Sequence, residues 1–421
     1  MTTSIVRVVF VAPFFMPATL RFVAAVAAQP GVRLGLVSQS ALGHLPRSLR
    51  ERVVAHYATP SCLDPGGLAQ AVAAVGARLG GVDRLLGALE QLQLQLGQVR
   101  DHLGIDGMGE AAAKNFRDKA RMKDVLRAAG LPCARHRLLR SPGEAITFAR
   151  EVGYPIVLKP PDGAAAVGTF RVGRDDELRR ALMSLQPSPE RPAVGEEFIT
   201  GVERSFETVS VRGQAVWDSM TRYDPPPLHV LDNPWIQWTV LLPREVDTAE
   251  ARAIRPHARA ALQALGMRTG LSHMEWFATP RRSDGVAISE VAARPPGAQI
   301  MPLNAYAHDV DFLRLWAELV VHERFDAPTR RYAAGAAFFR AQGPRAARPD
   351  GQRPRIVAVD GLDEAQREVG SLVVESKLPR IGAPPSSSYE GDGFAIVRHP
   401  DTEVVERALS RLIQRVRVRL G

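Results

Sequence analysis

Two glutamates in a predicted hairpin are the residues best suited to chemistry in this sequence. Segments His273–Ala278 and Val286–Val291 have the composition of short strands, and a polar turn separates them. The centre of this hairpin sets Glu275 opposite Glu290, where facing side chains lie about 5 Å apart and like charges repel. Such a pair calls for a cation, and Mg²⁺ commonly binds one or two carboxylates together with substrate phosphates. The alternative is a register shifted by one residue, which would turn one glutamate to solvent.

Two lysines stand near features that suit a polyphosphate. Of the 54 basic residues only five are lysines, so each remaining lysine is of interest. Lys119 lies near the start of a helix predicted over Asn115–Gly130, where a cation opposes the helix dipole unless an anion meets it. Lys159 ends a predicted strand and precedes the small-residue loop Asp162–Gly168, whose backbone could approach phosphate oxygens closely. A solvated lysine and a simple hairpin tip are the alternatives.

A third group of polar residues follows a proline-rich break in the middle of the chain. Two further strands are predicted here, and they carry more carboxylates than a plain hairpin needs without partners: Glu196, Glu197, Glu203 and Glu207. A loop at Pro225–Trp238 contains aromatic and amide side chains, a composition common in loops that contact substrate. An ordinary surface loop explains the same composition equally well.

The elements around these residues indicate an α/β protein. Apolar runs at Ile5–Ala12 and Val32–Ser38 flank a helical stretch, which predicts a β-α-β unit and a small parallel sheet. No G-x-G-x-x-G follows the first run, so the dinucleotide fingerprint is absent. The leucine spacing of Leu85–Leu103 predicts one helix. After Arg330 the texture changes to short strands, two helices and Pro-rich turns.

Composition narrows the classes of function. The chain has 421 residues, 45% of them apolar and 24% charged, which is typical of a folded protein with two or three domains. The net charge of +9 is spread along the chain without interleaved aromatics, so we expect no nucleic-acid partner. Cys62 and Cys133 have neither metal-site nor disulfide spacing. We expect a cytoplasmic protein, because neither a signal-peptide pattern nor an apolar run long enough for a membrane span is present.

In this order and spacing the motifs resemble those of ATP-grasp ligases. They are the Asp118 and Lys119 pair that opens a helix, the strand GYPIVLKP with its small-residue loop, EEFITGVE, and the hairpin that ends in EVAARPPG. The resemblance covers roughly the whole chain and is most specific over residues 115–297. It implies an ATP-grasp fold: a Rossmann-like parallel-sheet domain at 1–112, an ATP-grasp domain at 113–330 with a lid at about 130–200, and a small α/β domain at 331–421.

The resemblance also implies where ATP would bind. Lys119 and Lys159 would contact the phosphates, and the loop containing Gly163 and Gly168 would close over them. Glu196 would face the adenine amino group. The backbone of three residues would line the base: Glu197, Phe198 and Ile199. Glu203, seven residues after Glu196, would hold the ribose hydroxyls.

The metal site and the reacting groups follow from the same resemblance. Glu275 and Glu290 would carry Mg²⁺, with Mn²⁺ as an alternative ion. Arg294 would stabilise an acyl phosphate or fix a substrate carboxylate, which suits its bidentate guanidinium; with Lys159 it forms the implied catalytic pair. The chain departs from the family at Ala292, where an asparagine is usual, so the site lacks one metal ligand. The lid loop carries alanines where glycines are common.

The implied activity is ATP-dependent ligation of a small carboxylate, such as an amino acid, to an amine. The carboxylate would first become an acyl phosphate, and ADP and phosphate would be released. His273, the loop at Pro225–Trp238 and the segment Asn304–Asp309 are expected to line the substrate pocket. Two alternatives remain: a carboxylating or purine-biosynthetic relative, and an ATP-binding regulator without catalysis. The expected partners are small molecules, with neither nucleic acid nor membrane, and a homodimer is left open.

Overall fold

The amino-terminal part of the chain forms a four-stranded parallel sheet. The computed structural model describes residues 5–161, 168–280, 282, 284–345 and 353–421. The sheet order is β3-β2-β1-β4, and all its pairings are parallel. The strands are β1 (Val6–Val11), β2 (Val32–Ser38), β3 (Val53–Ala58) and β4 (Arg84–Leu86). Helices surround the sheet: α1 (Pro17–Ala27), α2 (Arg47–Arg50), α3 (Pro65–Leu79), α4 (Gln93–Leu103) and α5 (Glu110–Arg117). The predicted β-α-β unit and parallel sheet are confirmed.

One helix predicted in this region is wrong in its first half. Residues of the segment Leu85–Leu103 begin as strand β4, pass through the short 3₁₀ turn Glu90–Leu92, and become helical only in α4. Leu85 and Leu86 pair with Val9 and Phe10 of β1 and complete the parallel sheet. The leucine spacing could not distinguish the two structures, because short apolar runs suit a buried strand as well as a helix.

The centre of the molecule is an eight-stranded sheet that crosses the predicted boundary at Arg330. Its order is β13-β12-β9-β10-β11-β14-β18-β17, and its pairings are antiparallel. The central strands are β9 (Val202–Val211), β10 (Gln214–Asp224), β11 (Trp238–Leu242), β12 (Gly270–Ala278) and β13 (Val286–Ala292). The later strands are β14 (Ala333–Phe339), β17 (Val373–Lys377) and β18 (Gly393–His399). The carboxy-terminal segment therefore extends the central sheet, and the three-domain division stays a prediction.

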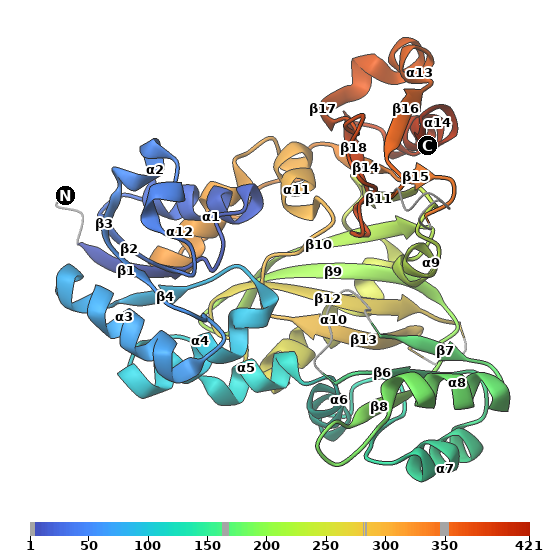
Figure 1. The fold of residues 1–421 in the computed structure, drawn as a ribbon, viewed down its shortest axis with the longest axis horizontal. Coiled ribbons are helices and arrows are strands. Elements are labelled where there is room, and N and C mark those ends of the chain that lie inside the picture. Colours follow the sequence, from blue (N-terminus) through green and yellow to red (C-terminus); the bar gives the residue numbers. More distant parts are fainter. Residues whose placement is uncertain (1–4, 162–167, 281, 283, 346–352) are drawn as a thin grey trace.

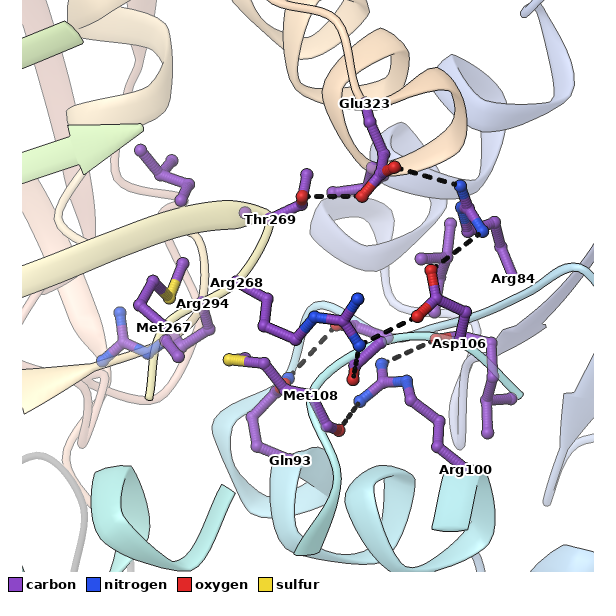
Figure 2. Close-up of a pocket in the computed structure, with 18 of the residues that line it drawn as sticks. Arg84, Gln93, Arg100, Asp106, Met108, Met267, Arg268, Thr269, Arg294 and Glu323 are labelled. Atoms are coloured by element: carbon purple, nitrogen blue, oxygen red, sulfur yellow. Dashed lines mark hydrogen bonds and ion pairs between the residues drawn. The ribbon is translucent and has the colours of Figure 1, made fainter. Parts of the chain in front are cut away.

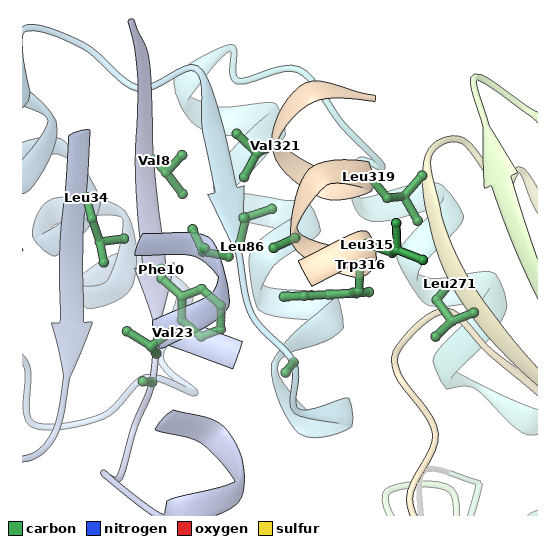
Figure 3. Packing of buried hydrophobic residues seen from close by; sticks show 14 of the residues in the cluster. Val8, Phe10, Val23, Leu34, Leu86, Leu271, Leu315, Trp316, Leu319 and Val321 are labelled. Atoms are coloured by element: carbon green, nitrogen blue, oxygen red, sulfur yellow. The ribbon is translucent and has the colours of Figure 1, made fainter. Parts of the chain in front are cut away.

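Helices link this sheet to its surroundings. Helix α10 (Ala249–Leu265) packs apolar residues against β12 and β13, and α11 (Ile300–His308) packs against β11 and β14. Helix α12 (Phe312–His322) joins the amino-terminal sheet to the central sheet. Its residues Leu315 and Trp316 share one core with Phe10 of β1 and Leu271 of β12 (Figure 3). None of the described helices is long and apolar enough to cross a membrane.

A smaller sheet lies beside the central one, within the segment where the lid is predicted (Figure 1). Its order is β5-β8-β6-β7, and its pairings are antiparallel. The strands are β5 (His136–Leu139), β6 (Ile156–Lys159), β7 (Phe170–Val172) and β8 (Ala193–Glu197). Helices α7 (Pro142–Val152) and α8 (Asp175–Leu185) share its core, and α6 (Lys119–Ala128) leads into it.

The last part of the chain adds a small α/β unit. Strands β15 (Ala341–Gln342), β16 (Ile356–Asp360) and β19 (Arg417–Leu420) form a three-stranded sheet in the order β15-β19-β16. Helices α13 (Leu362–Val369) and α14 (Thr402–Arg415) pack against it and against β14. A short helix, α9 (Pro227–Asp232), follows β10 and lies in the loop predicted at Pro225–Trp238.

Candidate active site

The predicted glutamate pair stands face to face in the hairpin of β12 and β13. The register pairs Glu275 directly with Glu290. The pairing of Glu275 with Glu290 depends on a bulge. Closer to the turn, Ala278 pairs with Val286 and Trp276 pairs with Ile288. A regular ladder would next place Ser289 opposite Glu275. Ser289 is instead the extra residue of a β-bulge, and the bulge returns Glu290 to the position opposite Glu275.

Cations surround this pair of carboxylates. The Lys119 Nζ atom lies 2.8 Å from Glu290 Oε1. The carboxylate of Glu290 is therefore an anion beside this lysine, as expected from its place near a helix start. His273 Nε2 lies 3.7 Å from Glu275 Oε1, and its Nδ1 lies 2.8 Å from Oε1 of the fully buried Glu207. Two hydroxyl groups, of Ser205 and Thr221, donate to Glu207 and hold it in place.

The electrostatic balance favours an ionised Glu275. Burial by itself would raise the pKa of Glu275, but the hydrogen bond and charge of His273 lower it to about 2. Burial likewise opposes the charge of His273, yet its two carboxylate partners raise its pKa to about 9. Glu203 behaves oppositely, because burial and the nearby Glu275 raise its pKa to about 8. One carboxylate is thus held charged beside another that is neutral near pH 7.

The side chain of Glu196 lies between two lysines. Lys159 Nζ is 2.9 Å from Oε2 of Glu196, and Lys123 Nζ is 3.4 Å from Oε1. Burial would raise the pKa of Glu196, but the two ammonium groups lower it to about 2. This carboxylate, expected from the resemblance to face adenine, contacts the two lysines instead.

Lys123 is a residue of this site that the sequence analysis missed. Its side chain is 1% exposed and it lines the same space as Lys119 and Lys159. A signal was present, because lysines are scarce in this chain and Lys123 lies one helical turn after Lys119.

Arg294 is held by a second residue that the sequence analysis did not select. Its Nη2 atom lies 2.7 Å from Glu90 Oε2, and Arg117 Nη1 lies 2.6 Å from the other oxygen of Glu90. Burial opposes the charge of Arg294, but the carboxylate of Glu90 raises its pKa. Glu90 enters from the loop between β4 and α4, so the amino-terminal sheet supplies one wall of the site.

The site residues lie around one cavity of about 750 Å³, between the sheet of β5–β8, the central sheet, and α1 with the loop after β4. The predicted residues that line it are Lys119, Lys159, Glu196, Glu197, Phe198, Ile199, Glu203, His273, Glu275, Glu290 and Arg294. Gly163 lies outside the described residues. Gly168 has a left-handed φ of 74° and adjoins the lining residue Thr169, but it does not itself line the cavity.

Comparisons with known proteins agree with this arrangement. Residues 124–305 match the family model of the ATP-grasp domain. The chain contains an ATP-grasp domain and has the ATP-grasp fold. Its fold is similar to that of the L-amino acid ligase from Bacillus licheniformis, with a TM-score of 0.75, 19% identity and 99% of both chains covered.

Two curated relatives are similar to this chain in sequence. Alanine–anticapsin ligase of Bacillus subtilis is 25% identical over 265 residues, which are 58% of this chain and 55% of the relative. The large chain of carbamoyl phosphate synthase from Thermus thermophilus is 26% identical over 225 residues, 52% of this chain. The match spans only 21% of that relative's length.

The carboxylates of the ATP-grasp hairpin suit Mg²⁺ as a two-ligand site. Among the described residues, no group of three or more His, Cys, Asp or Glu side chains could hold a metal ion. Ala292, where the family usually has asparagine, lies opposite His273 and supplies no ligand. Two facing carboxylates that line the same cavity as Lys119 and Lys159 nevertheless match the preference of Mg²⁺ for few protein ligands and several phosphate or water oxygens.

The wall opposite the hairpin comes partly from α9. Leu228, His229 and Asp232 line the cavity, as expected for the loop at Pro225–Trp238. The segment Asn304–Asp309 was expected there as well, and that expectation is wrong, since the residues that line the cavity include none from it. It belongs to α11 and its end, where Asn304 donates to Ile300 and is buried, because the apolar face of this helix packs into the core.

Arg340 fastens α9 to the carboxy-terminal part of the chain. Its Nη1 atom donates to the carbonyl oxygen of Val230 at 2.6 Å and to those of Asn233 and Ile236 at 3.4 Å each. The side chain is buried, and burial together with Arg345 lowers its pKa to about 10. This guanidinium therefore substitutes for water at three loop carbonyls.

Replacing Arg340 with methionine is expected to loosen this wall. The free energy of unfolding should fall by about 1–3 kcal/mol, because buried carbonyl oxygens lose their donor. Limited proteolysis should cut the loop at 225–238 faster in the variant. Arg411→Met, at a side chain that is 55% exposed, is the control and should change neither measurement. An unchanged cleavage rate in the Arg340 variant would show that other contacts hold the loop.

A second cavity of about 90 Å³ shares Arg294 with the first and is lined by a salt-bridge network (Figure 2). Arg268 Nη1 is 2.8 Å from Asp106 Oδ1, and Arg84 bridges Asp106 and Glu323 at 3.8 and 3.7 Å. Thr269 donates to Glu323 at 2.8 Å. These pairs join the amino-terminal sheet to the start of β12. We therefore interpret the residues around this cavity as structural contacts between the two parts.

Proposed function

We propose that this protein is an ATP-dependent ligase that activates a small carboxylate, such as an amino acid, for attack by an amine. The observation that carries the proposal is the convergence of two lysines, two facing glutamates and Arg294 on one cavity. The name of alanine–anticapsin ligase, a relative of 25% identity, supports an amino-acid substrate. Phosphoryl transfer depends on positioning and charge neutralisation, and these residue types supply both.

The nucleotide would lie between the lid and the central sheet. Lys119 and Lys159 would contact the phosphates, and the backbone of Glu197–Ile199 would line the adenine. Glu203 would hold the ribose, and its raised pKa of about 8 lets it donate as well as accept a hydrogen bond near pH 7. In this proposal Glu196 holds Lys123 and Lys159 in place, rather than binding the adenine amino group.

The reaction would break the bond between the terminal phosphorus of ATP and its bridging oxygen, and ADP would leave. An oxygen of the substrate carboxylate would form the new bond to phosphorus. The amine nitrogen would then attack the carbonyl carbon, and phosphate would leave as the nitrogen loses a proton. Glu275 and Glu290 would hold Mg²⁺ or Mn²⁺, which neutralises charge on the transferring group. Arg294 would release its contact with Glu90 and bind the substrate carboxylate in its place.

Release of ADP tests this function directly. A panel of amino acids, offered as carboxylates with a panel of amines, should include a pair that increases ADP release, and EDTA should abolish the increase. Lys159→Met should lower the rate about 10²-fold, because one cationic stabiliser of the phosphates is lost. Lys377→Met is the matched control, at an exposed lysine of β17.

ATP binding without ADP release under any of these conditions would contradict the proposal. That outcome would favour an ATP-binding protein without catalysis, an alternative for which the missing ligand at Ala292 is the specific observation.

A further inference from the structure

Helix α6 lies against the strand that carries Glu290. Three residues on one face of the helix contact three successive residues of β13. Lys119 Nζ is 2.8 Å from Glu290 Oε1, and the amide nitrogen of Val291 lies 3.2 Å from Met122 Sδ. The third contact is the shortest, since Lys123 Nζ donates to the carbonyl oxygen of Ser289 at 2.5 Å. Positions 119, 122 and 123 share a helix face because the spacings i+3 and i+4 do so.

The residue that Lys123 holds is the one that sets the register of the glutamate pair. Ser289 is the extra residue of the bulge between the pairs Trp276 with Ile288 and Glu275 with Glu290. A bulge leaves its extra residue without a regular ladder partner. Lys123 satisfies the carbonyl oxygen of Ser289 and fastens it to the helix.

Lys123 also reaches the lid. Its Nζ atom lies 3.4 Å from Glu196 Oε1 on β8, so one ammonium group joins the lid strand to the bulge. Burial lowers the pKa of Lys123, against the charge of Glu196, which raises it. Burial of a cation that is 1% exposed is costly unless its donors are used, and Lys123 contacts an oxygen of Glu196 and one of Ser289.

We propose that Lys123 is a positioning residue for the divalent-cation site. It fixes the bulge at Ser289, and so keeps Glu290 opposite Glu275 at the spacing that Mg²⁺ needs. The inference rests on the proposed function for the identity of the ion. It differs from the expectation for Lys119 and Lys159, because Lys123 acts through the backbone of β13 and not through contact with the nucleotide.

Binding of Mn²⁺, measured by electron paramagnetic resonance with ADP present, tests the inference without any ligation reaction. Lys123→Met should raise the dissociation constant of Mn²⁺ about 10-fold, since removing a residue that orients metal ligands commonly costs 10–100-fold in affinity. The affinity for ADP measured in EDTA should stay within about 2-fold of the wild type, as expected for a residue that only orients the ligands. Lys114→Met, at an exposed lysine of α5, is the control and should change neither constant.

If Lys123→Met does not fold, a milder variant on the same helix face tests whether the contacts of α6 with β13 support the cation site. Met122→Leu keeps the apolar volume but removes the sulfur acceptor for Val291. It should weaken Mn²⁺ binding by about 2–5-fold, less than the 10–100-fold common for such positions, because the contact of Lys123 with Ser289 remains. Unchanged Mn²⁺ binding in the folded variants overturns the inference. Equal loss of ADP affinity in EDTA also overturns it, because Lys123 would then be a nucleotide contact.

The same measurements separate this inference from the proposed function. A wild type that binds Mn²⁺ with ADP but releases no ADP in the substrate screen would contradict only the ligase proposal. Wild-type protein that binds no Mn²⁺ in the presence of ADP would overturn both.

Discussion

Glu290→Gln is expected to lower kcat for ADP formation by about 10²–10³-fold, the usual cost of removing one preorganised electrostatic stabiliser. Glutamine keeps the size of the side chain but loses the charge that faces Glu275 and pairs with Lys119 at 2.8 Å. The proposed site has only two carboxylates, so the loss of one should also raise the Mg²⁺ concentration needed for half-maximal rate. Steady-state ADP release over a range of Mg²⁺ concentrations measures both effects.

The control for this variant is Glu403→Gln, since the Glu403 side chain is 79% exposed at the start of α14. It should keep the rate and Mg²⁺ dependence of the wild type. If Glu290→Gln keeps its rate while its Mg²⁺ requirement is unchanged, the hairpin is not the metal site. If the rate falls with an unchanged Mg²⁺ requirement, Glu290 acts through Lys119 instead.

Glu196→Gln is expected to lower the free energy of unfolding by about 3–5 kcal/mol, because breaking a buried ion pair leaves uncompensated charge. Lys123 and Lys159 would remain buried near each other without a carboxylate between them. Their pKa values in the folded variant should fall, so the unfolded state would bind more protons. The stability of the variant should therefore rise as pH increases from neutral toward alkaline values. Denaturant unfolding at several pH values measures this difference from the wild type.

The adjacent Glu197 provides a control of the same residue type. Its side chain is 26% exposed and pairs with Arg135, which is 55% exposed. Glu197→Gln should cost at most about 1 kcal/mol, as expected for a pair near the surface. Equal losses for the two variants, or a loss at Glu196 that does not depend on pH, would contradict the assigned role of the buried carboxylate.

The sequence analysis predicted the hairpin of Glu275 and Glu290, and placed Lys119 and Lys159 near the ends of their elements, because the patterns that indicate them are local. The composition of the two segments and a polar turn predicted the strands around Glu275 and Glu290, and the two glutamates do pair. The strand that ends at Lys159 was predicted from neighbouring residues and is present. The helix predicted over Asn115–Gly130 is wrong at its start, because α5 ends at Arg117 and Asp118 caps a separate helix, α6. The apolar spacing of Leu85–Leu103 predicted a helix throughout, but the first residues form strand β4. They pair with β1, where the sheet buries them.

The sequence by itself thus determined the fold class and most of the charged residues that line the cavity. Only the tertiary structure decided which cations and carboxylates meet. Lys123 and Ser289 are 166 residues apart, and Arg294 and Glu90 are 204 apart. No local pattern specifies such contacts, because they depend on how separate elements pack. The bulge at Ser289 also depends on packing between separate elements. The residues near the turn pair in one register, and β13 shifts to a second register where α6 contacts it.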